Sequence, residues 1–423
     1  MKRSVLALFA VSACVIAEAA APVVTRCAAR QRWPWSQKVD IDFWLTSDTC
    51  ADVEFSATYD GALAPISLGA GLDESPLSLK PGLNHLTWDP VKAGLGSQKL
   101  TRFTIIPTVA TFDARKYLVL DLQTGDYEYA SEPPAEGGWT ADVYKSSKMV
   151  FRRVPAGIYE VGNTSEELTK FNVSTRPDVM ARRTVKITSD YYMAIFIMTA
   201  AQQNALNGRT PGTGFGYGKT SYEGLRGKIT NGTDSVIWPQ TGHKVANGSF
   251  IKKFRDKMKL PKGMLIDLPT ETQWEVAALA NRTTIFPAGG TIDDTVEDLL
   301  GYLNVTSVTV GNGTVGTKEP NGWGLYDTTG IFWEFALEGY NDSSLTDNGV
   351  TNPDFRDSAQ TVDPIGRECT ADETFKAITC NSGYISNPTK LTATMLPSYR
   401  VARLANVENV ATRFCIHLQP LVK

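Results

Sequence analysis

Alternating apolar and polar residues dominate the first third of the chain. Residues 39–45 (Val-Asp-Ile-Asp-Phe-Trp-Leu) alternate with a period of two, and residues 53–59 repeat the pattern before an Asp-Gly turn. This period is typical of β-strands that bury one face. Further strands are predicted at residues 83–88, 103–106 and 117–122. Short strands at this spacing predict an all-β sandwich over residues 20–130.

The pattern changes after a stretch rich in Pro and Gly, which predicts a linker over residues 131–144. In the remainder, residues 145–423, Thr199 and Thr270 are each followed three residues later by Gln, the sequence of a helix capping box. Ser249 precedes a third predicted helix with apolar residues at helical spacing. The fold class is therefore predicted to be α+β, an irregular second domain preceded by the all-β sandwich.

The N-terminus has the features of an export signal. Basic residues at positions 2–3 precede an apolar run, which ends in a small-x-small cleavage site at residues 17–19. A lipoprotein cleavage box at residues 11–14 is the alternative, but the apolar run continues past Cys14. We expect a signal peptide at residues 1–19 rather than lipid anchoring at Cys14, and therefore a secreted or periplasmic protein. No other run approaches the roughly 20 apolar residues of a membrane span.

Charge and histidine content narrow the classes of function. The 423 residues include 42 Lys and Arg against 45 Asp and Glu, a formal net charge of −3. No basic excess attracts a phosphate backbone, so nucleic-acid binding is not expected. The three histidines, at positions 85, 243 and 417, are far apart in sequence, so a metal site built from several histidines is not expected either.

Five cysteines remain after the predicted cleavage. In an oxidising compartment, proximity in sequence favours the pairs Cys27–Cys50 and Cys369–Cys380. Cys415 lies between two apolar residues and is then expected to be a buried thiol. The spacing alone does not fix this connectivity.

Several segments of the second domain resemble one known family. Residues 149–162 are similar to its opening strands, and residues 183–187 followed by 191–193 to the strand that enters its first helix. Residues 268–275 (Leu-Pro-Thr-Glu-Thr-Gln-Trp-Glu) are similar to its most recognisable helix. Residues 320–327 and 330–335 are similar to its central turn and strand. In this order the segments resemble the formylglycine-generating enzyme, or sulfatase-modifying factor, family. The resemblance implies an irregular variant of the C-type-lectin-like fold.

The segments that resemble the family contain residues that are expected to lie in the hydrophobic core. Trp274 and Trp333 are expected to be buried anchors rather than ligand platforms. Glu271 and Glu275 are expected to pair with buried amides or with an arginine, because a carboxylate that is shielded from solvent needs such partners.

The resemblance implies a place for the family's oxidase chemistry. That chemistry uses two cysteines that bind Cu(I) shortly after an Arg-Gly-Gly-Ser segment. The corresponding segment here is residues 380–384, which puts the two positions on Ser386 and about Leu391. A hydroxyl and an alkyl group are poor ligands for soft Cu(I), so copper is not expected. The iron-dependent relatives use clustered histidines, which this sequence lacks.

These departures favour a non-catalytic module, a pseudoenzyme that binds a protein, peptide or glycan ligand. The alternative is an active oxidoreductase of the formylglycine-generating type with a rearranged metal site.

The resemblance also implies a structural calcium ion. Asp327 and Glu334 would supply carboxylate oxygens, and Gly330 and Phe332 would supply backbone carbonyls. Hard oxygen ligands on a tight turn suit Ca²⁺. The alternative is a calcium-free turn in which Asp327 caps backbone amides.

Overall fold

The structure is a computed structural model that describes most of residues 21–418. The segments outside the description are residues 1–20, 48–49, 62–63, 111, 175–176, 230–235, 283, 288, 302–313, 330–331, 342–349, 352–359, 370–374, 381–390, 409 and 419–423. The predicted signal peptide and Cys14 lie outside the described residues, as do Gly330 and Ser386. Among the helices that the structure describes, none is long and apolar enough to cross a membrane.

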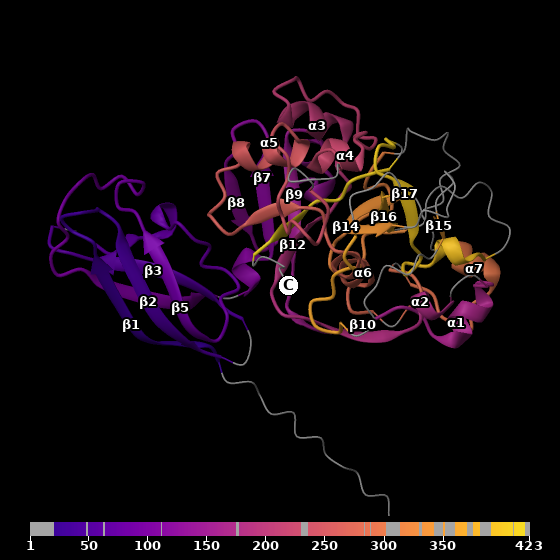
Figure 1. Cartoon of the computed structure of the whole chain (residues 1–423), viewed down its shortest axis with the longest axis horizontal. Helices are drawn as coiled ribbons and strands as arrows, with labels where there is room; N and C mark the ends of the chain where they lie inside the picture. The colour runs from indigo at the N-terminus through magenta and orange to yellow at the C-terminus, as the bar shows by residue number, and fades with distance from the viewer. Residues whose placement is uncertain are drawn as a thin grey trace, which may run out of the picture.

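Two three-stranded antiparallel sheets form the N-terminal unit, residues 21–110 (Figure 1). One has the order β1 (Val23–Gln31), β2 (Val39–Thr46), β5 (Gly82–Trp88), and the other β4 (Ile66–Ser67), β3 (Asp52–Thr58), β6 (Thr104–Ala110). Alternate residues of β2 are buried, as the period of two predicts. They share one core with residues of β3, where the rings of Phe43 and Phe55 are 5.1 Å apart.

A six-stranded sheet organises the C-terminal unit, residues 112–418. Its order is β13 (Leu265–Asp267), β18 (Cys415–His417), β12 (Tyr191–Ala194), β9 (Lys148–Val154), β7 (Tyr117–Asp121), β8 (Tyr127–Ala130). The segment of β7 and β8 falls within the sandwich predicted over residues 20–130, whereas the structure pairs β7 with β9 of the C-terminal unit. The first four residues of β7 are all buried, so the strand has no solvent face and its pattern carries no information about its neighbours.

The stretch predicted as a linker, residues 131–144, also packs onto this unit. Trp139 is buried, with its ring 5.1 Å from that of Tyr117 and 4.9 Å from that of Tyr144. Two short 3-10 helices, η3 (Gly138–Thr140) and η4 (Asp142–Lys145), carry Trp139 and Tyr144. Pro and Gly at this point therefore mark tight turns on a packed surface.

Smaller elements complete the C-terminal unit. One sheet pairs β10 (Gly157–Val161) with β11 (Arg183–Ile187), and another has the order β14 (Glu334–Asn341), β16 (Phe375–Cys380), β17 (Val401–Leu404), β15 (Val350–Thr351). The described helices are short: α1 (Ser165–Lys170), α2 (Pro177–Met180), α3 (Ala200–Leu206), α4 (Tyr222–Arg226), α5 (Phe250–Lys257), α6 (Glu271–Leu279) and α7 (Val296–Gly301). The predicted capping boxes at Thr199 and Thr270 and the cap at Ser249 are confirmed. The chain is thus a mixed structure of several small sheets and few helices; the C-type-lectin-like fold stays a prediction.

Buried ion pairs join the two units. Arg153 of β9 lies with Nη2 2.6 Å from Oδ1 of Asp52 on β3, and its Nε donates to Asp190 at 2.8 Å. Burial raises the pKa of Asp190, and Arg153 opposes that rise. The backbone amide of Ser75 donates to the carbonyl of Lys262 at 2.7 Å. The units are therefore docked against each other through buried polar groups.

Neither expected disulfide is formed among the cysteines that the structure describes. Cys27 sits at a register shift of β1, whereas the thiol of Cys50 donates to the carbonyl of Thr188 in the other unit at 3.1 Å. Cys369 and Cys380 belong to different core clusters. Proximity in sequence was misleading because each cysteine is directed into its own packing environment. Cys415 is buried, as expected.

Candidate functional site

A group of buried carboxylates and arginines surrounds the start of α6. The capping box of Thr270 and Gln273 fixes the first turn, and residues four apart lie on one helix face. Glu271 and Glu275 therefore reach the same guanidinium: Nη2 of Arg400 lies 3.0 Å from Oε2 of Glu271 and 2.9 Å from Oε2 of Glu275. The expected pairing of these glutamates with an arginine is confirmed, although nothing in the sequence identifies that arginine as Arg400.

A third carboxylate, Glu338 of β14, completes the group. Its Oε2 accepts a hydrogen bond from the backbone amide of Glu271 at 2.9 Å. Arg183 pairs with Oε1 of Glu271 at 2.9 Å, so both arginines of the group are directed to Glu271 and Glu275. Burial, together with the negative charge of Glu271, raises the pKa of Glu338 to about 8. Glu338 is therefore held as a neutral acid at neutral pH.

The aromatic residue of α6 anchors a second ion pair. The indole Nε1 of Trp274 donates to Oε2 of Glu334 at 2.6 Å, and Arg413 donates to both carboxylate oxygens of Glu334 at 2.8 and 3.0 Å. All three side chains are buried. The expectation of a core role for Trp274 is confirmed, whereas Trp333 is only partly buried and packs at the edge of two clusters.

The positions that correspond to the family's metal-binding thiols are Ser386 and about Leu391, and Cys380 is the thiol that precedes them in sequence. Cys380 ends β16 and is fully buried, and this burial raises the pKa of its thiol well above the ordinary value. Leu391 belongs to an apolar cluster with Phe171, Leu396 and Tyr399. Ser386 lies outside the described residues. In the part of the chain that the structure describes, no three His, Cys, Asp or Glu side chains are grouped so that they could hold a metal ion.

The turn expected to bind calcium is held by hydrogen bonds. Oδ2 of Asp327 accepts from the backbone amide of Gly316 at 2.7 Å. Phe332 is buried and its ring lies 4.1 Å from that of Tyr217. Glu334 faces Arg413, so it would have to leave a buried ion pair in order to ligate a cation. Asp327 thus has the amide-capping contact of the calcium-free alternative.

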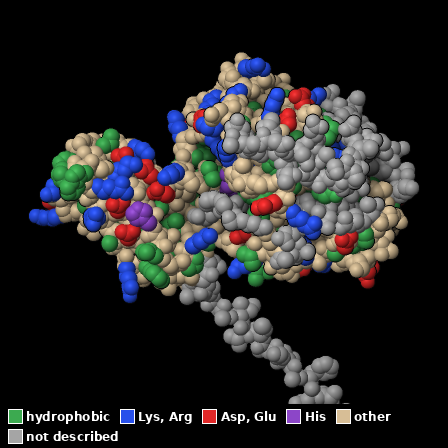
Figure 2. All heavy atoms as spheres, in the orientation of Figure 1, with side chains coloured by type: hydrophobic (Ala, Val, Ile, Leu, Met, Phe, Trp, Pro, Cys, Tyr) green, Lys and Arg blue, Asp and Glu red, His purple; other side chains and the backbone are tan. Residues whose placement is uncertain are grey.

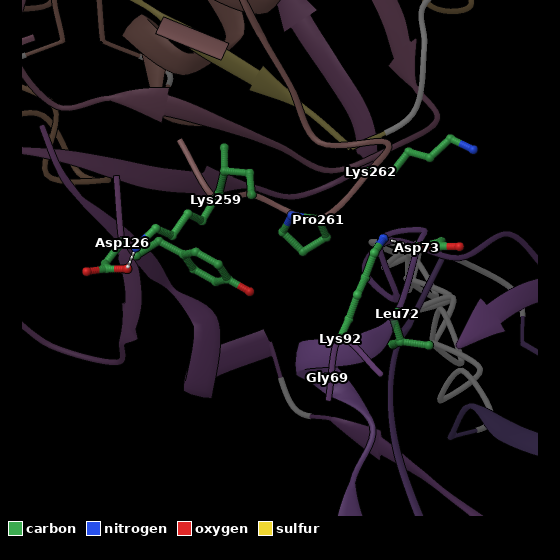
Figure 3. Close-up of a pocket in the computed structure, with 10 residues that line it drawn as sticks. Gly69, Leu72, Asp73, Lys92, Asp126, Lys259, Pro261 and Lys262 are labelled. Atoms are coloured by element: carbon green, nitrogen blue, oxygen red, sulfur yellow. Dashed lines mark hydrogen bonds and ion pairs between the residues drawn. The ribbon is translucent and has the colours of Figure 1, made fainter. Parts of the chain in front are cut away.

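A polar cleft of about 600 Å³ lies between the two units (Figure 3). Its N-terminal wall contains Asp73 and Lys92, which form an ion pair of 2.5 Å. Its C-terminal wall contains Asp126 and Lys259, which form one of 2.7 Å, with Pro261 drawn between the two pairs. The other lining residues are Gly69, Leu72, Tyr127, Leu260 and Lys262. Although burial opposes the change, Lys38 and Lys92 lower the pKa of Asp73, which is therefore charged at neutral pH.

No sequence motif predicts this cleft, because its walls come from segments that are far apart in the chain. The volume is in the range of small-molecule sites.

One family model matches the chain. It is the model of the sulfatase-modifying factor enzyme 1-like domain, and it matches residues 140–362, which is more than half of the chain. The chain belongs to the sulfatase-modifying factor family. No curated protein and no solved structure matches it. The matched region includes α6 and the Asp327 turn, and it ends before Cys380 and Arg413.

Because the chain belongs to the sulfatase-modifying factor family, its residues can be compared with the ligands that Cu(I) and Ca²⁺ require. For Cu(I), the counterpart position that the structure describes is Leu391, a buried alkyl side chain, and the thiol of Cys380 before it in sequence is buried with a raised pKa, so neither offers a thiolate. For Ca²⁺, Asp327 and the carbonyl of Phe332 have suitable chemistry, but the two oxygens of Glu334 are engaged by Arg413. The residues do not fit copper, and the calcium site stays a prediction.

Proposed function

We propose that this protein is an exported, non-catalytic binding member of the sulfatase-modifying factor family. The observation that carries the proposal is the state of Cys380, which is fully buried with a thiol pKa well above its ordinary value. Family oxidation chemistry needs thiolates that can reach a metal and a substrate. Leu391 supports the same conclusion, because its side chain fills an apolar core.

The cleft between the two units is the proposed ligand site. Lysines from both walls offer ammonium donors, and Asp73 and Asp126 offer carboxylate acceptors, so a polar small molecule or the tip of a peptide would find partners on either side. Each wall carries its own ion pair, and both side chains of the Asp126–Lys259 pair are exposed, so exchanging that pair for ligand contacts costs little.

The experiment that tests the non-catalytic role is a direct assay of family chemistry. The exported chain is incubated with Cu(I), a reductant, O₂ and a peptide that carries the cysteine of a sulfatase motif. Mass spectrometry then measures conversion of that cysteine to formylglycine, and competition with a chromogenic Cu(I) chelator measures copper affinity. We expect no conversion above a no-protein control and no stoichiometric copper.

Two matched variants test whether any observed activity depends on Cys380. Cys380→Ser removes the thiol nearest to the family's metal position, and Cys415→Ser removes another fully buried thiol from β18. Conversion that is lost in Cys380→Ser and kept in Cys415→Ser would overturn the proposal, because it would place working chemistry on Cys380.

A further inference from the structure

The solvent side of the sheet β1–β2–β5 carries an unusual set of side chains. Because successive residues of a strand point to opposite faces, the alternate residues that are not used in the core share one face. We call this the outer face, and it consists of Val23, Thr25, Ala28 and Arg30 from β1, Asp40, Asp42 and Trp44 from β2, and Leu83 and His85 from β5. Figure 2 shows a histidine among acidic and basic side chains on the N-terminal unit, with hydrophobic side chains close by.

The middle of the outer face is a row of polar groups that hold one another in place. Arg32 donates to both carboxylate oxygens of Asp40, with Nη2 2.6 Å from Oδ1 and Nε 3.0 Å from Oδ2. Nδ1 of His85 lies 2.8 Å from Oδ1 of Asp42, its cross-strand neighbour. The hydrogen bond from Arg32 lowers the pKa of Asp40. The row therefore presents donors and acceptors in a fixed arrangement.

Apolar side chains lie at both ends of this row. At one end Trp44 is 45% exposed and pairs across the strands with Leu83, which is 71% exposed. At the other end the loop between β1 and β2 carries Trp35, which is 90% exposed and whose backbone amide donates to the carbonyl of Arg32 at 3.1 Å. Trp44 lies four residues from Asp40, which is about 13 Å along a strand. Trp44 and Leu83 therefore form an exposed apolar pair beside the polar row.

We propose that the outer face binds a neutral, extended polysaccharide chain. The C–H groups on one face of a sugar ring carry a slight positive charge, and they pack against the negative face of an indole ring. The sugar hydroxyls would then exchange hydrogen bonds with the Arg32, Asp40, Asp42 and His85 row between the two tryptophans. None of the outer-face residues lines the cleft, and the surface adds a second binding function to the proposed one.

The charges and the spacing favour a glycan over a protein partner. Arg30 and Arg32 balance Asp40 and Asp42, so the outer face attracts neither a polyanion nor a polycation. Protein interfaces gain most of their energy from a continuous apolar centre, with charged groups at the rim. The order here is reversed, because charged groups occupy the centre and aromatic rings the ends. A sugar chain alternates apolar ring faces with hydroxyl groups on the same small scale.

Affinity electrophoresis of the full exported chain tests the proposal. Native gels are cast with hydroxyethylcellulose or laminarin as neutral glycan probes, or with dextran sulfate as a polyanion. We expect retardation by at least one neutral glycan. Trp44→Ala and Trp35→Ala should each raise the dissociation constant at least tenfold, and Trp44→Phe should retain part of the affinity. Ile158→Ala, at an exposed apolar residue of β10, is the matched control and should bind like the parent chain.

A readout of folding makes the result decisive. Both tryptophans are exposed, so the melting temperatures of their variants should stay within a few degrees of the parent. Absence of retardation by both neutral glycans, equal retardation of the parent and Trp44→Ala, or retardation by dextran sulfate alone would overturn the inference. The peptide-oxidation assay on the same preparation is independent, so failure of glycan binding leaves the non-catalytic proposal standing.

Discussion

Replacing Glu338 by Gln should stabilise the protein in a strongly pH-dependent way. Three buried carboxylates, Glu271, Glu275 and Glu338, lie close together, and Arg183 and Arg400 form ion pairs with the first two. Glu338 is neutral in the folded state, with a pKa raised to about 8 by burial and by Glu271. In the unfolded chain it ionises near its ordinary value of 4.5. Gln keeps the shape and the acceptor for the amide of Glu271, but it has no proton to lose.

The magnitude follows from proton linkage. The folded acid binds its proton more tightly than the unfolded acid, so stability from this group is complete below about pH 4.5 and is lost as the pH rises toward 8. Between pH 5 and pH 7 the loss amounts to about 2 to 3 kcal/mol for pKa values of 4.5 and about 8. The advantage of Glu338→Gln over the parent should therefore grow by about 2 to 3 kcal/mol over this interval.

Urea unfolding at pH 5 and pH 7, followed by the fluorescence of the nine tryptophans, measures this difference. Glu166→Gln, which removes a carboxylate from an exposed position of α1, is the control for loss of charge alone. An advantage of Glu338→Gln that is equal at the two pH values, or larger at pH 5, would refute the assignment of a neutral acid in this group.

Three further predictions concern other parts of the chain. His417 is buried, and burial together with nearby His243 lowers its pKa to about 3. On acidification the unfolded chain therefore takes up a proton at this residue before the folded chain does, which destabilises the fold. His417→Gln should abolish about 2 kcal/mol of the stability lost between pH 7 and pH 5, measured by the same urea titrations. If the Asp327 turn binds Ca²⁺, excess Ca²⁺ should raise the melting temperature and Asp327→Asn should remove that response; identical melting curves with calcium and with chelator would support the calcium-free turn. Limited proteolysis should not cut first within residues 131–144, because Trp139 is buried there, and early cleavage in this stretch, located by mass spectrometry, would contradict the packing.

Local chemistry made parts of the fold predictable. The caps at Thr199, Ser249 and Thr270 depend on side chains within three residues of one another, so the sequence contains all of the information. The alternation along β2 is likewise a local signal of one buried face. The partner of β7 was not predictable, because a strand buried on both faces has no alternation that could identify its neighbours.

The candidate site, too, was predictable only where local chemistry determines a residue's role. The role of Glu271 and Glu275 followed from the cost of burying a carboxylate, which holds for any partner. The partner itself, Arg400, lies 129 residues beyond Glu271, and the neutral state of Glu338 depends on how many arginines reach the group. The walls of the cleft belong to both units, so no single segment carries its signature.

The shared guanidinium of Arg153 has a consequence for how the molecule moves. Separating the two units would leave Asp52, Arg153 and Asp190 without one another, and stranding one member of a buried ion pair typically costs about 3 to 5 kcal/mol. The contact thus acts as a clamp, and thermal motion at ordinary temperatures rarely opens it. If a polymer binds the outer face, the C-terminal unit is therefore held at a set angle and distance from that polymer. The two units then move as one rigid body and not as independently moving domains.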